Sequence, residues 1–236
     1  MNGSPSLNRN ANSLKIGGLT RLSTCDWPGE LAATVFCQGC AWDCAYCHNP
    51  GLRQAQSEEQ ISWSSVLQFL ASRRGLLDAV VFSGGEPTLQ PALLDAVREV
   101  RALGFRVGLH TAGMAPARFA ALLPLLHWVG FDVKAPFAVY PRITGVARSG
   151  ESAMQSLQSL LASGVRYEVR TTVHPALLSS DDLIELQSQL LSLGVESFVL
   201  QQFRPHGMLP GRLQPAAASF ALPEKFGSEF SHFLVR

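Results

Sequence analysis

The chain alternates short apolar runs with longer stretches of helical periodicity, and this alternation restricts the possible fold more than any other feature. Four of the joints carry a glycine that closes a helix-like stretch and precedes an apolar run: Gly75, Gly104, Gly164 and Gly194. Their separations are 29, 60 and 30 residues, which fits a strand–helix unit of constant length with one unmarked joint. A helix often ends in a left-handed residue, a conformation that costs glycine little. The rhythm therefore predicts an α/β fold with parallel strands.

The predicted helices each carry apolar side chains on one face. The first begins after Ser62, a residue type that caps helix N-termini. A spacing of three or four residues places the apolar positions on one side of a helix. These positions are Trp63, Val66, Leu67 and Leu70 in the first helix; Leu93, Val97 and Val100 in the second; Met154, Leu157 and Leu161 in the next marked one; and Leu183, Leu186, Leu190 and Leu193 in the last.

Six apolar runs alternate with these helices. They are short and almost continuously hydrophobic, as parallel strands covered by helices are. Doubly wound sheets and barrels share this rhythm, so periodicity alone does not separate them. The runs are Ala32–Cys37, Ala79–Phe82, Arg106–Leu109, Trp128–Phe131, Tyr167–Thr171 and Ser197–Leu200.

Polar side chains gather where each apolar run ends. In a barrel the carboxyl ends of the strands meet around one opening, where catalytic residues collect. We therefore expect a partial (β/α)6 TIM-like barrel, incomplete because the chain is too short for eight units. The polar segments are the loop after Cys37, then Ser83-Gly84-Gly85-Glu86-Pro87, His110-Thr111, Asp132-Val133-Lys134, Arg170-Thr171-Thr172 and Gln201-Gln202.

The domain organisation follows from composition. Residues 1–12 are polar and rich in Asn and Ser, so we expect a disordered N-terminus. We expect one domain over 13–236, with a barrel core at about 30–204 and a tail at 205–236. The tail carries four phenylalanines that we expect to seal a barrel end rather than to form a second domain: Phe220, Phe226, Phe230 and Phe233.

Charge and apolar content argue against several classes of partner. The net charge is +1, which gives no general reason to expect nucleic acid or an anionic membrane surface. No apolar run approaches membrane-spanning length, and the N-terminus lacks the apolar core of a secretory signal. Three of the five cysteines lie within eight residues, unlike a disulfide framework. These features favour the reducing cytoplasm.

Cys40, Cys44 and Cys47 form a C-x3-C-x2-C triplet within Gly39–Pro50. Three thiolates on one tight loop can each bind a different iron of a cubic [4Fe–4S] cluster. No fourth cysteine follows at a matching interval, so one iron would keep an open coordination position. The main alternative is a structural zinc ion.

For the zinc alternative, His48 or Cys25 would supply the fourth ligand. Cys37 also forms a C-x2-C pair with Cys40, so a shifted ligand set is conceivable. Cys37 ends an apolar run, where a small buried thiol is the ordinary interpretation. We expect structural roles for Cys25 and Cys37.

The stretch Gly39-Cys-Ala-Trp-Asp-Cys-Ala-Tyr-Cys-His-Asn49 resembles the signature of radical S-adenosylmethionine (SAM) enzymes. Ser83-Gly84-Gly85-Glu86-Pro87 matches the Gly-Gly-Glu motif of the same superfamily, and its partial barrel suits the six runs. The resemblance implies one [4Fe–4S] cluster on the three cysteines of the triplet, with SAM chelating the fourth iron. Beyond the cluster and SAM it implies no separate catalytic residue.

The resemblance also implies roles for residues around SAM. Gly84, Gly85 and Glu86 would position the methionyl amine, since a carboxylate attracts an ammonium group and glycines permit close backbone approach. Tyr46 matches an aromatic position near the adenine, with simple packing of the loop as the alternative. The other cofactor-binding candidates lie at strand ends and are Thr111, Asp132, Lys134, Arg170 and Thr172. Of these, Arg170 and Thr172 would contact the carboxylate or the ribose of SAM.

A narrower resemblance points to activating proteins of anaerobic ribonucleoside-triphosphate reductase, which are glycyl-radical-enzyme activases. It is carried by Ile16–Leu19, Asp26-Trp27-Pro28-Gly29, Gln38–Pro50 and the Asp132–Pro136 segment. Several relatives have Asp-Thr-Asn-Gly where this chain has His110-Thr111-Ala112-Gly113. The role of a histidine in place of that acid is left open.

The resemblance implies a reaction. An electron from a donor such as flavodoxin or ferredoxin would cleave SAM into methionine and a 5′-deoxyadenosyl radical. The radical would take a hydrogen atom from a glycine of the partner, most plausibly the large subunit of anaerobic ribonucleotide reductase. The alternatives are a small-molecule enzyme similar to 7-carboxy-7-deazaguanine synthase, and a zinc-stabilised binding module without catalysis.

Overall fold

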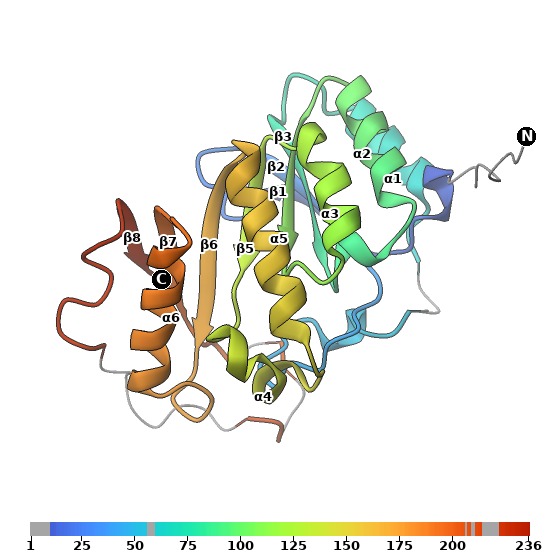
Figure 1. Cartoon of the computed structure of the whole chain (residues 1–236). Helices are drawn as coiled ribbons and strands as arrows, with labels where there is room; N and C mark the ends of the chain where they lie inside the picture. The colour runs from blue at the N-terminus through green and yellow to red at the C-terminus, as the bar shows by residue number, and fades with distance from the viewer. Residues whose placement is uncertain (1–9, 56–59, 206, 209–210, 214–221) are drawn as a thin grey trace, which may run out of the picture.

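The computed structural model describes residues 10–55, 60–205, 207–208, 211–213 and 222–236. Its centre is one eight-stranded sheet in which the strands follow each other in sequence order, from β1 to β8 (Figure 1). Only the pair β1 and β2 is antiparallel, and the other six pairs are parallel. The strands are β1 (Ile16–Ser23), β2 (Ala32–Cys37), β3 (Ala79–Gly84), β4 (Arg106–Thr111), β5 (Trp128–Asp132), β6 (Arg166–Val173), β7 (Ser197–Gln202) and β8 (His232–Val235).

The six predicted strand runs are confirmed as β2 to β7. Strands β3 to β7 continue by one or two residues beyond the predicted apolar runs, since the ladder pairs these residues too. Two strands were not predicted, β1 before the core and β8 after it. They extend the sheet at both edges, so the architecture is an open α/β sheet and not a closed barrel.

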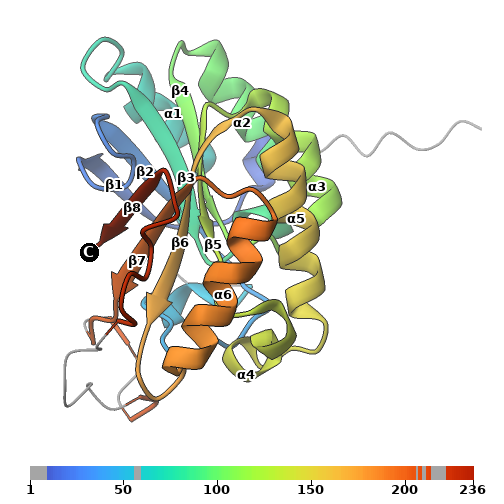
Figure 2. The same ribbon diagram turned by 60° about the vertical axis from the view of Figure 1, so that its left-hand side comes forward.

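The longer helices lie on one face of the sheet, which Figure 2 shows from the side. They are α1 (Trp63–Ala71), α2 (Leu93–Ala102), α3 (Pro116–Leu122), α5 (Ser149–Ser163) and α6 (Ser180–Ser192), and a short α4 (Tyr140–Thr144) precedes α5. The predicted cap is confirmed, because the Ser62 side chain accepts a hydrogen bond from the Ser65 backbone N–H. All four marker glycines have positive φ. The unmarked joint is at α3, which runs into a 3-10 turn containing Pro124.

The predicted apolar face of α5 is partly wrong. Met154 is 37% exposed, whereas Ala153, Leu157 and Leu160 are fully buried. The face of α5 that meets the sheet is therefore shifted by about one residue from the predicted face. It includes small side chains, which let the helix approach the sheet closely. Ser156 belongs to this face, and its hydroxyl donates to the Gly113 carbonyl at 2.8 Å.

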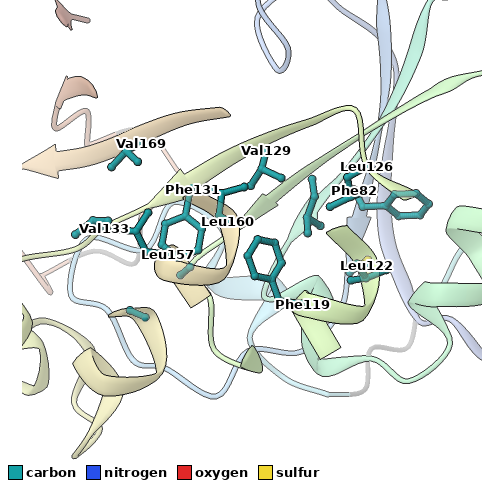
Figure 3. Packing of buried hydrophobic residues seen from close by; sticks show 14 of the residues in the cluster. Phe82, Phe119, Leu122, Leu126, Val129, Phe131, Val133, Leu157, Leu160 and Val169 are labelled. Atoms are coloured by element: carbon teal, nitrogen blue, oxygen red, sulfur yellow. The ribbon is translucent and has the colours of Figure 1, made fainter. Parts of the chain in front are cut away.

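The main core lies between the sheet and the helices. Figure 3 shows Phe119 and Leu122 of α3 and Leu157 and Leu160 of α5 against the strand residue Phe131. The rings of Phe119 and Phe131 have centroids 5.9 Å apart. All of these side chains are almost completely inaccessible to solvent. Burial of apolar area on this scale is the main stabilising contribution to such a domain.

The opposite face of the sheet has its own smaller core around Trp27, in the connection between β1 and β2. Trp27 is 1% exposed and stacks on Trp128 at 5.5 Å, with Ala32, Ala79 and Val81 completing the cluster. The connection therefore folds under this face instead of looping into solvent.

Replacing Gly108 with Ala is expected to lower the free energy of unfolding by about 1–3 kcal/mol, as overpacking of a core does. An added Cβ would lie 2.8 Å from the Trp27 ring and 3.3 Å from Val81. The matched control is Gly18→Ala in β1, where the nearest atom is 3.5 Å away. Urea unfolding of both variants measures the difference. Equal stabilities would show that Trp27 is not tightly packed.

The two described ends of the chain pack differently: the N-terminal turn contacts helices α1 and α2, whereas the C-terminal tail adds a strand to the sheet edge. Residues 1–9 lie outside the described residues, while Ala11–Ser13 form a 3-10 turn in which Ala11 is buried. In the tail, Phe226, Phe230 and Phe233 cluster on Phe198 of β7, and β8 pairs along β7. The described tail thus covers the last strand of the core. Phe220 lies outside the described residues.

Among the residues that the structure describes, no helix has both the length and the hydropathy needed to cross a membrane.

Candidate active site

One cavity of about 330 Å³ lies at the carboxyl ends of the parallel strands, on the face away from the helices. Each of the six central strands contributes lining side chains, so the sheet curves around the cavity as a partial barrel would. These strand residues include Phe36, Ser83, His110, Asp132, Arg170 and Gln201. The expected gathering of polar strand ends is therefore found at one place.

The cysteine loop after β2 forms another wall of this cavity. Cys40 and Cys44 line it, while Cys47 is half-buried and is not among the lining residues. A backbone hydrogen bond from Cys40 N to the Arg53 carbonyl at 3.0 Å anchors the start of the loop, and one from Cys47 N to the Cys44 carbonyl at 3.1 Å closes a turn within it. The three thiols are free and are carried on one short, anchored segment.

Asp43, between the first two cysteines of the triplet, ties the loop to two distant segments. Its carboxylate lies 2.6 Å from the Arg53 guanidinium and also pairs with Arg212, beyond β7. Farther along the loop, His48 Nε2 lies 2.9 Å from the Arg204 carbonyl and its ring stacks on Phe203. The segment after β7 is therefore attached to the cysteine loop across the open side of the sheet.

The donor set suits an iron–sulfur cluster. Burial raises the pKa of Cys40 to about 11 and also raises that of Cys44, so cluster binding would have to displace their protons. Among the described residues, no three His, Cys, Asp or Glu side chains converge on one point as ligands of a single ion would. A cubic cluster does not require this, because each thiolate binds a different iron.

The other cysteines lie apart from the triplet. Cys25 precedes β2, is exposed and contacts the Ser23 hydroxyl at 3.4 Å. Cys37 is fully buried at the end of β2, and burial raises its pKa far above the usual range. The Nε2 atom of His48 is engaged by the Arg204 carbonyl. None of the three is arranged as an evident additional ligand.

Gly84, the last residue of β3, and Gly85, which follows it, pack directly against the backbone at the end of β2 and the start of the cysteine loop. An added Cβ on Gly84 would lie 2.4 Å from the Cys37 carbonyl oxygen, and one on Gly85 would lie 2.3 Å from that of Gly39. Gly84 also has a φ of 114°, which favours glycine. Both glycines line the cavity, so no side chain fills the space beside the cysteines.

Glu86 is only 1% exposed and is not among the residues that line the cavity. Its Oε1 accepts from the hydroxyls of Thr88 and Thr111, both at 2.6 Å, and from the Thr88 backbone N–H. Its Oε2 accepts from the Ala112 backbone N–H at 2.9 Å. Burial raises the pKa of Glu86 in spite of these donors. The carboxylate thus joins the loops that follow β3 and β4.

Buried Arg170 and half-buried Asp132 and Lys134 form a chain of charges on one side of the cavity. Asp132 Oδ1 lies 2.8 Å from Arg170 Nη2, and Asp132 Oδ2 lies 3.3 Å from Lys134 Nζ. Burial alone would raise the pKa of Asp132, but the two cations outweigh it and hold the pKa well below its usual range. Two cations against one carboxylate leave this wall suited to an anionic group such as a carboxylate.

Tyr46 extends this charged wall toward the cysteines. Lys134 Nζ lies 5.6 Å from the centroid of its ring, within the range of a cation–π interaction. The Tyr46 hydroxyl is buried and has no hydrogen-bond partner among the described residues. The Tyr140 hydroxyl accepts from the Lys134 backbone N–H at 2.9 Å and so fixes the loop that carries the lysine. An unpaired buried hydroxyl beside the cavity is a group that a ligand could satisfy.

His110 occupies the floor of the cavity, at the position where the sequence resemblance leads us to expect an acid. Its Nε2 lies 2.7 Å from the Asp26 carbonyl oxygen, which can only accept, and 3.3 Å from Arg170 Nη1, which can only donate; we assign the proton to Nε2 because the contact with the carbonyl is the shorter one. Nδ1 then accepts from the Ser83 hydroxyl at 3.2 Å. Burial and the nearby Arg170 lower the pKa of His110 to about 4. A neutral histidine therefore replaces a negative charge at this position.

We expect stability to fall as the pH is lowered from about 6.5 to about 4, because His110 binds its proton only when the chain unfolds. The neutral state of His110 contributes at most roughly 3 kcal/mol to the free energy of unfolding, and this contribution is fully present above pH 6.5. The variant His110→Gln retains a donor and an acceptor but does not titrate. Urea unfolding from pH 7 to pH 4 should give a shallower decline for the variant. Parallel curves would contradict the neutral buried state of His110.

The structure brings most of the predicted site residues to the cavity. Eight of the nine cofactor-binding candidates, Thr172 included, line it, and Glu86 is the exception. Sequence reasoning missed the contribution of Asp26 to the floor, and of Met114 and Trp42 to the wall. The segment Asp26–Gly29 had been noted for its resemblance alone. No local signal in the sequence indicates that this connection folds under the strand ends.

Residues 34–186 match the family model described as the Radical SAM superfamily. A Methanocaldococcus jannaschii protein named as a glycyl-radical enzyme activating enzyme is 29% identical over 201 residues, covering 80% of each chain. The pyruvate formate-lyase-activating enzyme of Clostridium pasteurianum is 27% identical, covering 75% of this chain and 76% of its own. The 7-carboxy-7-deazaguanine synthase of Methanopyrus kandleri is 33% identical, but only over 46% of this chain and 51% of its own.

Similar solved structures include SuiB of Streptococcus suis, with a TM-score of 0.60 at 11% identity over 84% of this chain. SuiB bound to S-adenosylmethionine has a TM-score of 0.58 at 13% identity over 74% of this chain. The present chain spans less than half the length of these SuiB chains, 47% and 40%. QueE of Escherichia coli has a TM-score of 0.52 at 19% identity, covering 80% of this chain and 84% of its own. At these identities the similarity establishes a common fold.

Proposed function

The chain belongs to the radical SAM superfamily, and we propose that it is a glycyl-radical-enzyme activase. The observation that carries this proposal is the similarity to two activating enzymes over three quarters or more of both chains. The proposal is also supported by the position of the cysteine loop, which forms one wall of the polar cavity at the strand ends. The partner in this proposal is a glycyl radical enzyme, the large subunit of anaerobic ribonucleoside-triphosphate reductase. A flavodoxin or ferredoxin in a reducing cytoplasm would supply the electron.

We assign the cluster to Cys40, Cys44 and Cys47. When bound, the cluster and SAM would supply a reductively formed carbon radical that takes a hydrogen atom from the partner's glycine. The glycine pair Gly84 and Gly85 leaves room for a ligand against the loop backbone.

The charged wall would hold the polar end of SAM. Lys134 and Arg170 attract its carboxylate, and Asp132 keeps both cations in place through its two oxygens. Tyr46 offers a ring face and an unpaired hydroxyl beside the same space. Thr111 and Glu86 would act together, since the Thr111 hydroxyl that lines the cavity donates to Glu86. Glu86 would thereby position the methionyl amine through the loop it stabilises.

Electron paramagnetic resonance tests the proposed function. Protein reconstituted with iron and sulfide under anaerobic conditions is incubated with a strong chemical reductant, SAM and the candidate reductase subunit. We expect methionine, 5′-deoxyadenosine and a glycyl-radical doublet. A reductase in which the radical glycine is replaced by Ala is the control. SAM cleavage without a doublet would exclude this reductase as the partner.

A second candidate is a small-molecule enzyme similar to 7-carboxy-7-deazaguanine synthase, favoured by the partial match to the Methanopyrus kandleri protein. Its substrate would have to fit beside SAM in the same cavity. Anaerobic incubation of the reconstituted protein with SAM, reductant and a small-molecule cell extract, followed by mass spectrometry, distinguishes this candidate. Formation of 7-carboxy-7-deazaguanine would establish it, whereas absence of this product would leave the activase.

A further inference from the structure

A second cavity, which we call the outer groove, lies on the other side of the cysteine loop. It has a volume of about 430 Å³ and is bordered by Ser13, Lys15, Gln38–Ala41, Arg53, Ala55 and Leu89–Ala92. Cys40 lines both the outer groove and the active-site cavity. The cysteine loop is therefore a thin wall between the cavity and this part of the surface.

The backbone connects the groove closely to this wall. Cys40 N donates to the Arg53 carbonyl at 3.0 Å, and Gly39 N donates to the Leu52 carbonyl at 2.7 Å. Lys15 Nζ, on the other side of the groove, donates to the Ala55 carbonyl at 3.2 Å. A molecule seated here would reach the cysteine loop without entering the cavity that we assign to SAM.

The surface of the groove combines an apolar middle with basic groups. Ala41, Leu89 and Pro91 are apolar, and Lys15 and Arg53 are the charged residues of the lining. None of the described residues that line it is acidic. At its rim Arg118 donates to the Leu89 carbonyl. Arg53 shares the nearby acid Asp43 with Arg212, so these three side chains together keep one net positive charge. Such a patch is complementary to an acidic protein.

We propose that the outer groove docks the electron donor, a small acidic redox protein that presents the edge of its prosthetic group to Cys40. This inference rests on the proposed function, which consumes one electron for each SAM molecule cleaved. The reduced donor loses that electron and the loaded cysteine site gains it, with no atom transferred. The partner glycine enters from the active-site cavity, so donor and partner use opposite sides of the loop.

Charge reversal in the groove tests the proposal. Lys15→Glu reverses a lining charge, and Pro91→Glu adds an acid at an exposed lining position. Arg166→Glu is the matched control, since Arg166 is exposed at the amino end of β6. Lys15→Arg keeps the charge. All four variants are compared as cluster-loaded full chains, because the donor is expected to recognise that form.

Two measurements are made with photoreduced flavodoxin as the probe. Stopped-flow absorbance gives the rate at which the loaded protein oxidises it, and calorimetry with oxidised flavodoxin gives a Kd without any turnover. At low salt we expect both acidic variants to accept an electron from flavodoxin at least about 10-fold more slowly than the wild type. We also expect them to bind oxidised flavodoxin correspondingly more weakly. The difference should shrink at high salt, where charges are screened. The control and Lys15→Arg should match the wild type.

Dithionite separates this inference from the proposed function. With dithionite, all variants should be reduced and should cleave SAM at wild-type rates, because this reductant needs no docking surface. If no protein cleaves SAM with dithionite, the proposed function fails, whereas a groove defect appears only with flavodoxin. Unchanged flavodoxin kinetics in both acidic variants would overturn the docking site. So would normal flavodoxin kinetics combined with a loss of glycyl-radical formation, since the groove would then bind the partner enzyme.

Discussion

The Cys44→Ser variant is expected to lose iron–sulfur assembly and SAM cleavage almost completely while remaining folded. Cys44 lines the cavity from a loop that follows β2, outside the hydrogen-bonded ladder of the sheet. A serine hydroxyl is far less acidic than a thiol and is a poor ligand for iron. Iron and sulfide analysis after anaerobic reconstitution, with the visible absorbance of the product, measures cluster loading. Circular dichroism and urea unfolding measure the fold.

Cys25→Ser is the matched control for this loss. Cys25 is exposed and does not border the cavity, so the variant should load iron and cleave SAM as the wild type does. A Cys44→Ser protein that still cleaves SAM would show that the ligand assignment is wrong. Loss of loading in Cys25→Ser as well would point to a different ligand set. Aerobically purified wild type that contains zinc and no iron would favour the structural-zinc alternative.

Glu86→Ala is expected to lower the free energy of unfolding by about 3–5 kcal/mol, because it strands several buried donors at once. The carboxylate accepts from two threonine hydroxyls and from the backbone N–H groups of Thr88 and Ala112. No water replaces it readily, since Glu86 and Thr88 are each only 1% exposed. SAM affinity should fall as well, because the Thr111–Gly113 loop loses its anchor.

Glu86→Gln and Thr88→Val divide this effect into parts. The amide keeps one acceptor oxygen but brings its NH2 group to the Ala112 N–H, so we expect a smaller loss of about 1–3 kcal/mol. Thr88→Val removes one donor and leaves the rest of the network intact. Urea unfolding at pH 7 gives all three values. A Glu86→Ala protein within about 1 kcal/mol of the wild type would mean that the network contributes little.

Much of the sheet could be predicted because its strands are short, apolar and separated by helices of regular spacing. The six runs correspond to β2–β7, and the polar segments after them reach a common cavity. The edge strands could not be found in this way. β1 contains Gly17 and Gly18 and is largely half-buried, so it lacks the apolar run of a central strand. β8 has four residues and becomes a strand only by pairing with β7.

The predicted site depended on local spacing, and its other features depend on contacts between distant segments. Cys40, Cys44 and Cys47 are neighbours in the chain, so their common loop is evident from the sequence. The contact of Glu86 with the loop after β4 joins residues 25 and 26 positions apart. The packing of the chain decides whether a carboxylate such as that of Glu86 faces a ligand or a neighbouring loop, and this cannot be predicted from the residue type.

The sequence by itself determined the order of strands and helices, the cysteine triplet and the polar ends of the strands, because these follow from periodicity and from residues close in the chain. Only the tertiary structure decided that Trp27 underlies the cavity, that His110 is neutral, and that Cys40 separates two cavities. These properties arise from burial and from groups brought together across long intervals of sequence. Burial and proximity depend on how the whole sheet curves.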